Sequence, residues 1–96
     1  MNIYLSLSAK NNLEKKIKEY NNPEKHIELY IRSTSCCSGP NIGMAFDYPS
    51  EDDTIYNIDG ITFIVNKVLE PIIKSIYIDY YFDDMKTGFK IQADRY

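Results

Sequence analysis

The strongest constraint on the fold is a pair of short apolar segments separated by two turn-forming residues. Thr54–Ile58 and Ile61–Val65 are rich in β-branched residues, and Asp59 and Gly60 lie between them. An Asp-Gly dipeptide tolerates the positive φ angles that a type I′ turn requires at both of its central positions. The sequence therefore predicts a β-hairpin over residues 54–65.

Alternating apolar and polar residues predict further strands along the chain. In each of them every second side chain is apolar, which is typical of a strand with one buried face. A last strand is predicted at Gly88-Phe89-Lys90-Ile91, after a turn at Asp83-Asp84. The alternating apolar positions of the other strands are Ile3, Leu5 and Leu7, then Ile27, Leu29 and Ile31, then Met44, Phe46 and Tyr48, and finally Ile76, Ile78, Tyr80 and Phe82.

One helix of substantial length is predicted near the N-terminus. Ser8 can serve as its N-cap, and Asn21-Asn22-Pro23 is expected to end it. The apolar residues between these limits recur every three or four positions, as on one helix face: Ala9, Leu13, Ile17 and Tyr20. A shorter helix is predicted within Asn66–Lys74, with Pro71 near its first turn.

The composition is that of a single globular domain. The chain has 96 residues, of which 44% are hydrophobic and 26% charged. We therefore predict one domain over residues 1–96, of the α+β class but mainly β, with antiparallel or mixed strands.

The net charge of −3 and the scattered basic residues argue against a nucleic-acid partner. Without a basic leader or a membrane-spanning segment, the protein is expected to be cytoplasmic and to have no membrane partner.

Cys36 and Cys37 are adjacent within the turn-forming segment Ser35–Pro40. In a reducing cytosol such a pair is considered first as a metal-binding or redox-active site. Adjacent Cα atoms lie about 3.8 Å apart, which is closer than a disulfide prefers, so a bond between the two sulfurs would be strained. Joint action on one metal requires irregular backbone, which Ser38-Gly39-Pro40 can supply. Spacing alone also permits one buried, inert thiol and one idle surface thiol.

The other candidate residues carry weaker signals. His26, the single imidazole, could be a metal ligand only if the fold brings it close to Cys36 and Cys37. The pairs Asp52-Asp53 and Asp83-Asp84 are predicted to be solvated turn residues. The sequence has no Gly-rich phosphate loop, no Ser-His-Asp set and no four-ligand zinc spacing. No catalytic residue is therefore predicted, unless Cys36 and Cys37 perform redox chemistry themselves.

Taken in order from about Ile3 to Ile91, the chain resembles the HesB/IscA-like family, the A-type carriers of iron–sulfur cluster biogenesis. The opening strand and the helix that follows look like the start of that domain. The short segments that carry the rest of the resemblance are Cys37-Ser38-Gly39, Glu51-Asp52-Asp53, Ile58-Asp59-Gly60-Ile61, Phe63-Ile64-Val65, Ile78-Asp79-Tyr80 and Gly88-Phe89-Lys90-Ile91.

The chain departs from the family pattern at two places. Members that carry clusters or iron have a further Cys-Gly-Cys just beyond the Gly-Phe-Lys segment, whereas this chain ends Gln92–Tyr96 without it. Cys36 stands where the family usually has Gly. The resulting Cys-Cys-Ser-Gly run looks like a small branch of HesB-related proteins in which the pair can be Cys and selenocysteine.

The resemblance implies a carrier that holds iron, an iron–sulfur cluster or another soft metal. Cys37 would be the inherited ligand and Cys36 the added one, with Ser38 and Gly39 completing the binding segment. Two thiolates cannot fill a tetrahedral site alone, so water, a carboxylate, a small thiol or a second subunit must contribute. A homodimer would bring four thiols together, and the expected partners are iron–sulfur assembly or acceptor proteins.

Two alternatives remain open from the sequence. The first is a redox protein whose vicinal thiols attack a disulfide, a persulfide or a selenium compound, since a position that alternates between thiol and selenol suggests redox or soft-element chemistry. The second is a HesB-like interaction module that has no metal chemistry. The identity of the metal or substrate, the redox state of the pair and the oligomeric state are not determined by the sequence.

Overall fold

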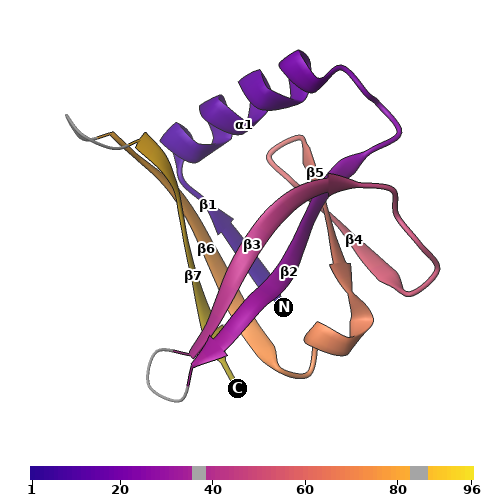
Figure 1. The fold of residues 1–96 in the computed structure, drawn as a ribbon, viewed down its shortest axis with the longest axis vertical. Helices are drawn as coiled ribbons and strands as arrows, with labels where there is room; N and C mark the ends of the chain where they lie inside the picture. The colour runs from indigo at the N-terminus through magenta and orange to yellow at the C-terminus, as the bar shows by residue number, and fades with distance from the viewer. Residues whose placement is uncertain (36–38, 83–86) are drawn as a thin grey trace.

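The computed structural model describes residues 1–35, 39–82 and 87–96, which form two mixed β-sheets and one long helix (Figure 1). A three-stranded sheet has the order β1-β6-β7, and a four-stranded sheet has the order β3-β2-β5-β4. The elements in chain order are β1 (Asn2–Leu5), α1 (Leu7–Tyr20), β2 (His26–Ser35), β3 (Gly39–Asp47), β4 (Asp53–Ile58), β5 (Ile61–Asn66), the 3₁₀ helix η1 (Lys67–Leu69), β6 (Ile73–Phe82) and β7 (Thr87–Arg95). The mainly β, α+β prediction is confirmed.

Two strand pairings in these sheets are parallel. β1 pairs with β6, with Ile3 beside Ile76, and β2 pairs with β5, with Ile27 beside Phe63. The remaining described pairings are antiparallel: β2 with β3, β4 with β5, and β6 with β7. Parallel neighbours need a long crossover connection, and here α1 and the hairpins lie within those connections. β3 also lies alongside β7, so the two sheets approach each other at that edge.

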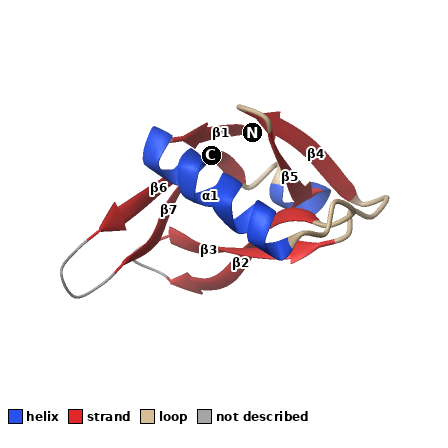
Figure 2. Cartoon of the chain, turned by 90° about the horizontal axis from the view of Figure 1, so that it is seen from above, coloured by secondary structure: helices blue, strands red, loops and turns tan. Residues whose placement is uncertain are grey.

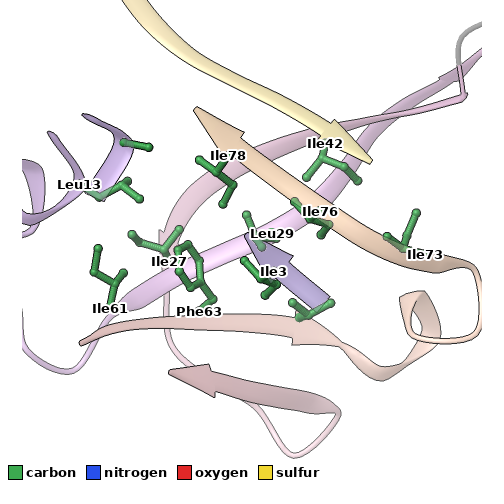
Figure 3. Packing of buried hydrophobic residues seen from close by; sticks show 12 residues of the cluster. Ile3, Leu13, Ile27, Leu29, Ile42, Ile61, Phe63, Ile73, Ile76 and Ile78 are labelled. Carbon is green, nitrogen blue, oxygen red and sulfur yellow. The ribbon is translucent and has the colours of Figure 1, made fainter. Parts of the chain in front are cut away.

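The hydrophobic core fills the space between the two sheets (Figure 3). Phe63, Val65 and Ile73 have no exposed surface, and Leu29 and Ile76 are only 1% exposed. Seen from above, α1 lies across the strands (Figure 2) and closes one end of the core with Ala9 and Leu13. The alternating isoleucines and leucines of the sequence therefore supply most of the interior.

The N-cap of α1 is Ser6, so the prediction of Ser8 is wrong by two residues. Ser6 has an extended backbone, and its hydroxyl accepts a hydrogen bond of 3.1 Å from the N–H of Ala9. The Ser6 N–H donates to the carbonyl of Ile78 at 3.0 Å, which ties Ser6 to the end of the β1–β6 pair. Leu7, expected in the opening strand, lies in the helix and is 72% exposed.

The end of α1 is predicted correctly, but its buried face is narrower than expected. Asn21 adopts the left-handed conformation and its N–H donates to the carbonyl of Ile17, a common way to end a helix. Ile17 and Tyr20, which were expected to be in the core, are 37% and 43% exposed. Tyr20 stacks instead on Phe46 of β3, with a centroid distance of 4.2 Å.

The hairpin at residues 54–65 is confirmed. β4 and β5 pair without interruption, and Asp59 and Gly60 have φ angles of 53° and 85°, as a type I′ turn requires. The predicted short helix is reduced to η1, whose N-cap is Asn66. Pro71 lies beyond η1 instead of in its first turn.

The limits of three later strands also differ from the predictions. β6 begins at Ile73, earlier than the predicted Ile76, and β7 extends beyond the predicted segment as far as Arg95. Met44 and Phe46 share the inner face of β3 as predicted, but Tyr48 lies after the strand and is 51% exposed. The Asp83-Asp84 turn lies outside the described residues.

Candidate functional site

The predicted binding segment lies at the connection between β2 and β3. Cys36, Cys37 and Ser38 lie outside the described residues, while Gly39 is the first residue of β3. Gly39 pairs with Ser35, and Pro40 pairs with Thr34. The prediction that Gly39 and Pro40 belong to the irregular turn is therefore wrong, because antiparallel pairing continues to the residue after Ser38. The connection that carries both thiols thus consists of residues 36–38 alone.

The β2–β3 ribbon that carries this connection has one irregularity. Its register shifts between Ile31 and Ser33, next to Arg32. Such β-bulges bend a ribbon and increase its local twist, and they are common beside functional sites. On the inner face, Ile31 lies opposite Ile42, which is buried in the core. The bulge therefore lies where the ribbon passes from the core toward the thiol connection.

Gly43 lets two side chains pack closely over β3 near the bulge. It is the cross-strand partner of Tyr30. A Cβ atom at this position would lie 2.5 Å from Cγ of Arg32 and 2.7 Å from Cζ of Tyr30. Tyr30 and Arg32 therefore cover the glycine backbone, an arrangement that compensates for the missing side chain of a strand glycine. This close packing lies next to the register shift of the β2–β3 ribbon.

His26 lies at the opposite end of the same ribbon. It is the first residue of β2 and pairs with Asp47, whereas the thiol connection follows Ser35. The ten residues His26–Ser35 span roughly 30 Å in an extended strand. The fold therefore does not return His26 to the thiol connection of its own chain, and this imidazole has no place in a site at Cys36 and Cys37.

Near the His26 end of β2, the fold brings together several carboxylates that lie apart in the sequence. Partial burial, followed by the neighbouring carboxylates of Asp47 and Asp53, raises the pKa of Glu28 above its ordinary value. Asp53, predicted to be a solvated turn residue, is instead the half-buried first residue of β4, and its carboxylate accepts hydrogen bonds from the N–H and hydroxyl of Ser50 in the preceding turn. Strand register brings Glu28 and Asp47 together, since they lie on one face of neighbouring strands. Glu28 and Asp47 lie far apart in the sequence, so their positions in the chain alone do not indicate that the two carboxylates are neighbours.

A second polar feature lies on the outer face of the three-stranded sheet. Ser6 donates a 2.6 Å hydrogen bond to Asp79, and this bond together with the Tyr80 N–H lowers the pKa of Asp79. The rings of Tyr4 and Tyr77 stack beside them with a centroid distance of 5.0 Å. The surface is hollowed here by about 410 Å³. The hydrogen bond joins the start of α1 to β6, so its evident role is structural.

An apolar groove of about 250 Å³ lies between α1, β3 and β7, with Lys16 at its rim. Its larger apolar lining residues are Leu13, Ile27, Met44, Phe46 and Phe89. Within residues 1–35, 39–82 and 87–96, no group of three or more His, Cys, Asp or Glu residues is arranged to hold a metal ion. In the same part of the chain no helix has the length and apolarity needed to cross a membrane.

Comparison with curated proteins identifies several relatives. A protein of Aquifex aeolicus (strain VF5) is 34% identical over 80 residues, which cover 81% of this chain and 68% of that protein. The putative iron-sulfur cluster insertion protein ErpA of Ralstonia nicotianae is 30% identical over 86 residues, covering 88% of this chain and 68% of the relative. ErpA of Aromatoleum aromaticum is 32% identical over 74 residues, covering 76% and 63%. The chain thus spans 63% to 68% of the length of these three relatives. No protein-family model matches the sequence.

Solved structures share the fold over nearly the whole chain. Escherichia coli SufA, described as involved in biosynthesis of iron-sulfur clusters, aligns with a TM-score of 0.74 and 17% identity, covering 97% of this chain and 86% of SufA. IscA with a [2Fe-2S] cluster aligns with a TM-score of 0.68 and 17% identity, covering 95% and 81%. A solution structure of an Aquifex aeolicus protein aligns with a TM-score of 0.64 and 23% identity, covering 96% and 94%. At these identities the likeness concerns the fold.

Proposed function

Since this chain belongs to the HesB/IscA-like family of A-type carriers, we propose that it takes part in iron–sulfur cluster biogenesis by binding and passing on a thiolate-held cargo. The cargo is iron, an iron–sulfur cluster or another soft metal, and Cys36 and Cys37 are its ligands. Thiolates are the protein ligands that iron–sulfur clusters and soft metals prefer. The relatives named ErpA and the fold shared with IscA support this class of cargo.

The observation that carries the proposal is the pairing of Ser35 with Gly39. It leaves only residues 36–38 between two hydrogen-bonded strands, so both thiols belong to one short connection. A short connection limits the number of backbone conformations and so reduces the entropy lost when two ligands converge on one ion. Ser38 and Gly39 are proposed to supply backbone N–H groups that hydrogen-bond to bound sulfur.

The site needs further ligands beyond one thiol pair, because a tetrahedral thiolate site has four positions. We propose that a second chain, a small thiol or another exogenous ligand fills them. His26 is excluded as a ligand within the same chain by its place at the far end of β2. A site completed from outside the chain also suits a carrier, since an acceptor protein can replace those ligands during transfer.

Anaerobic reconstitution tests this proposal. The purified chain is incubated with ferrous iron and sulfide under a thiol reductant, and bound iron, sulfide and visible absorption are then measured. Wild-type protein is expected to retain a chromophore. Cys37→Ala should lose it, Cys36→Ala should weaken retention, and the Val68→Ala control, an exposed site on η1, should behave as wild type. The proposal fails if wild-type protein retains no iron or if Cys37→Ala retains as much as wild type.

The redox alternative predicts a different result in a second measurement. Alkylation rates measured against pH would show an acidic, fast-reacting thiol in the metal-free protein if the pair attacks disulfides or persulfides. Ordinary thiol behaviour together with bound iron supports the carrier. Interaction with assembly or acceptor proteins and the cytoplasmic location both remain predictions.

A further inference from the structure

The apolar groove between α1, β3 and β7 is the surface feature whose use the proposed thiol site does not explain. Leu13 and Ile27, which belong to the buried core, line part of it. Met44, Phe46 and Phe89 also line it and are only half-buried, so each keeps surface that is open to solvent. Concave apolar surface of this kind is typical of sites that bind a ligand or the side chain of a partner.

Contacts between aromatic rings hold the sides of the groove in place. Phe46 stacks on Tyr20 of α1 with a centroid distance of 4.2 Å, and Phe89 meets Tyr80 edge to face at 5.0 Å. Side chains that are already held lose little conformational freedom when a ligand binds. Met44, in contrast, has an unbranched thioether side chain that can adapt to the shape of what enters. The groove is therefore largely preformed, with one adaptable side chain.

The volume of the groove limits what it can hold. At about 250 Å³ it is smaller than the roughly 300 to 1,000 Å³ of most sites for cofactors and other small molecules. Protein interfaces are commonly anchored by one bulky apolar or aromatic side chain that fills a pocket of the partner. The groove therefore matches one such anchor side chain better than it matches a cofactor.

Two lysines place positive charge beside the groove. Lys16 lies at its rim and is the one charged residue among the described residues that line it. Lys25 lies beyond the Phe46 side, because its Nζ is 5.7 Å from the centroid of the Tyr20 ring and that ring stacks on Phe46. A carboxylate brought to the groove would therefore meet an ammonium group at either of two places.

The carboxylates of the chain are concentrated elsewhere. α1 has four lysines and two glutamates, whereas the remaining residues include seven basic and twelve acidic side chains. Glu28 and Asp47 alternate along their strands with Ile27 and Phe46, so they lie on the opposite face of the β2–β3 ribbon from the groove. The groove thus combines apolar surface with positive charge on a protein whose net charge is negative, which favours an acidic ligand.

We propose that this groove binds an acidic segment of a partner protein through one bulky apolar side chain. That side chain enters between α1, β3 and β7 and contacts Met44, Phe46 and Phe89. Acidic residues on either side of it in the segment lie near Lys16 and Lys25. No residue of the thiol connection takes part, so this contact and the proposed cargo binding can each fail without the other.

A titration with a short acidic peptide tests this contact. The probe is an acetylated and amidated peptide with one phenylalanine at its centre and aspartates and glutamates on both sides. It is added to the reduced, metal-free full chain labelled with nitrogen-15, and the backbone amide signals are followed by NMR. The signals expected to shift are those of Leu13, Lys16, Met44, Phe46 and Phe89.

Changes to the peptide and to α1 separate the two parts of the contact. Replacing the phenylalanine by alanine should weaken binding at least about tenfold, because the anchor side chain is lost. Lys16→Glu reverses the charge at the rim and should weaken binding of the acidic peptide about three- to tenfold. Lys15→Glu is the matched control, because Lys15 is the neighbouring exposed lysine and lies beside Gly60 and Ile61 instead. Its effect should be less than about twofold, since screening weakens charges outside the contact.

Several outcomes would overturn the proposal. The groove signals do not shift, the alanine peptide binds as tightly as the phenylalanine peptide, or Lys15→Glu and Lys16→Glu weaken binding equally, which would indicate general attraction only. Equal binding of a peptide with lysines in place of its acidic residues would indicate an apolar ligand of any charge. Groove signals that shift with protein concentration alone would indicate a second copy of the chain as the occupant. Both of these results contradict an acidic partner.

Discussion

The two hairpins of the four-stranded sheet differ in how they are closed and in what they contribute. β4–β5 is closed by the two-residue turn at Asp59 and Gly60, and all six residue pairs keep one register. β2–β3 is longer, shifts register beside Arg32, and is closed by the connection that carries Cys36 and Cys37. One hairpin is regular and supplies core residues from β5. The other is bulged and carries the candidate site at its end.

Under the proposed function, stability and cargo binding would depend on different hairpins. β5 contributes Ile61, Phe63 and Val65 to the core, each at most 2% exposed. The β2–β3 ribbon is anchored in the core by Ile27, Leu29 and Ile42, but its closing connection lies beyond them in the strand register. Substitutions in β5 are therefore expected to act on folding first, and substitutions near the bulge on cargo binding first.

The largest expected effect is that of Phe63→Ala. Truncating this fully buried ring leaves a cavity and should lower the free energy of unfolding by about 3 to 5 kcal/mol. Urea denaturation followed by circular dichroism measures the change. Phe82→Ala is the matched control, since Phe82 is 83% exposed, and it should change stability by less than about 0.5 kcal/mol. Equal losses in the two variants would contradict the assignment of the core.

Gly43→Ala should have a smaller effect on stability and a specific effect on cargo. The new methyl group would displace Tyr30 and Arg32, which lie 2.5 to 2.7 Å from the Cβ position, at a cost of about 1 to 3 kcal/mol. We expect this variant to retain less iron than wild type at temperatures where both remain folded. Gly88→Ala is the matched control on β7, because its Cβ would meet Tyr81 only at 3.4 Å. If both variants retain iron equally, the packing at Gly43 does not support the site.

Gly60→Ala should affect only the regular hairpin. No atom lies within 4 Å of the Cβ position, so the cost comes from the φ angle of 85° alone and should be about 1 kcal/mol. Gly60→Asn should recover part of this loss, since asparagine tolerates positive φ angles. Thermal unfolding measures both variants. Iron retention below the unfolding transition should stay unchanged, and a loss of retention would show that the two hairpins are coupled.

The smallest expected effect concerns the carboxylates at the His26 end of the ribbon. Because the pKa of Glu28 is raised in the folded state, the folded protein favours the protonated carboxyl, and stability falls as pH rises from 4.5 through the raised value. Glu28→Gln should remove this fall and be more stable than wild type at neutral pH by less than about 1 kcal/mol. Chemical denaturation at a series of pH values tests this. Glu14→Gln on α1 is the control, and an identical pH dependence in wild type and Glu28→Gln would refute the explanation.

The sequence predicted the site only in part. The adjacency of Cys36 and Cys37 suggested the candidate ligands, and the family resemblance suggested the chemistry proposed for them. The end of the turn at Gly39 was missed, because glycine and proline are common in turns and strand pairing overrode that preference. The Glu28 and Asp47 pair was also missed, since 18 intervening residues separate positions that only strand register brings together.

Local chemistry determined the features that the sequence predicted correctly by itself. The Asp59-Gly60 turn, the end of α1 at Asn21 and the alternating faces of the strands depend on residues within one turn or one strand, so their energetics can be read from neighbours in the chain. The tertiary structure decided what depends on distant segments. Parallel pairing of β1 with β6 joins residues more than 70 positions apart, and the bond from Ser6 to Ile78 selects Ser6 over Ser8 as the helix cap. Both Ser6 and Ser8 can cap a helix, and only the packing of the assembled sheets distinguishes them.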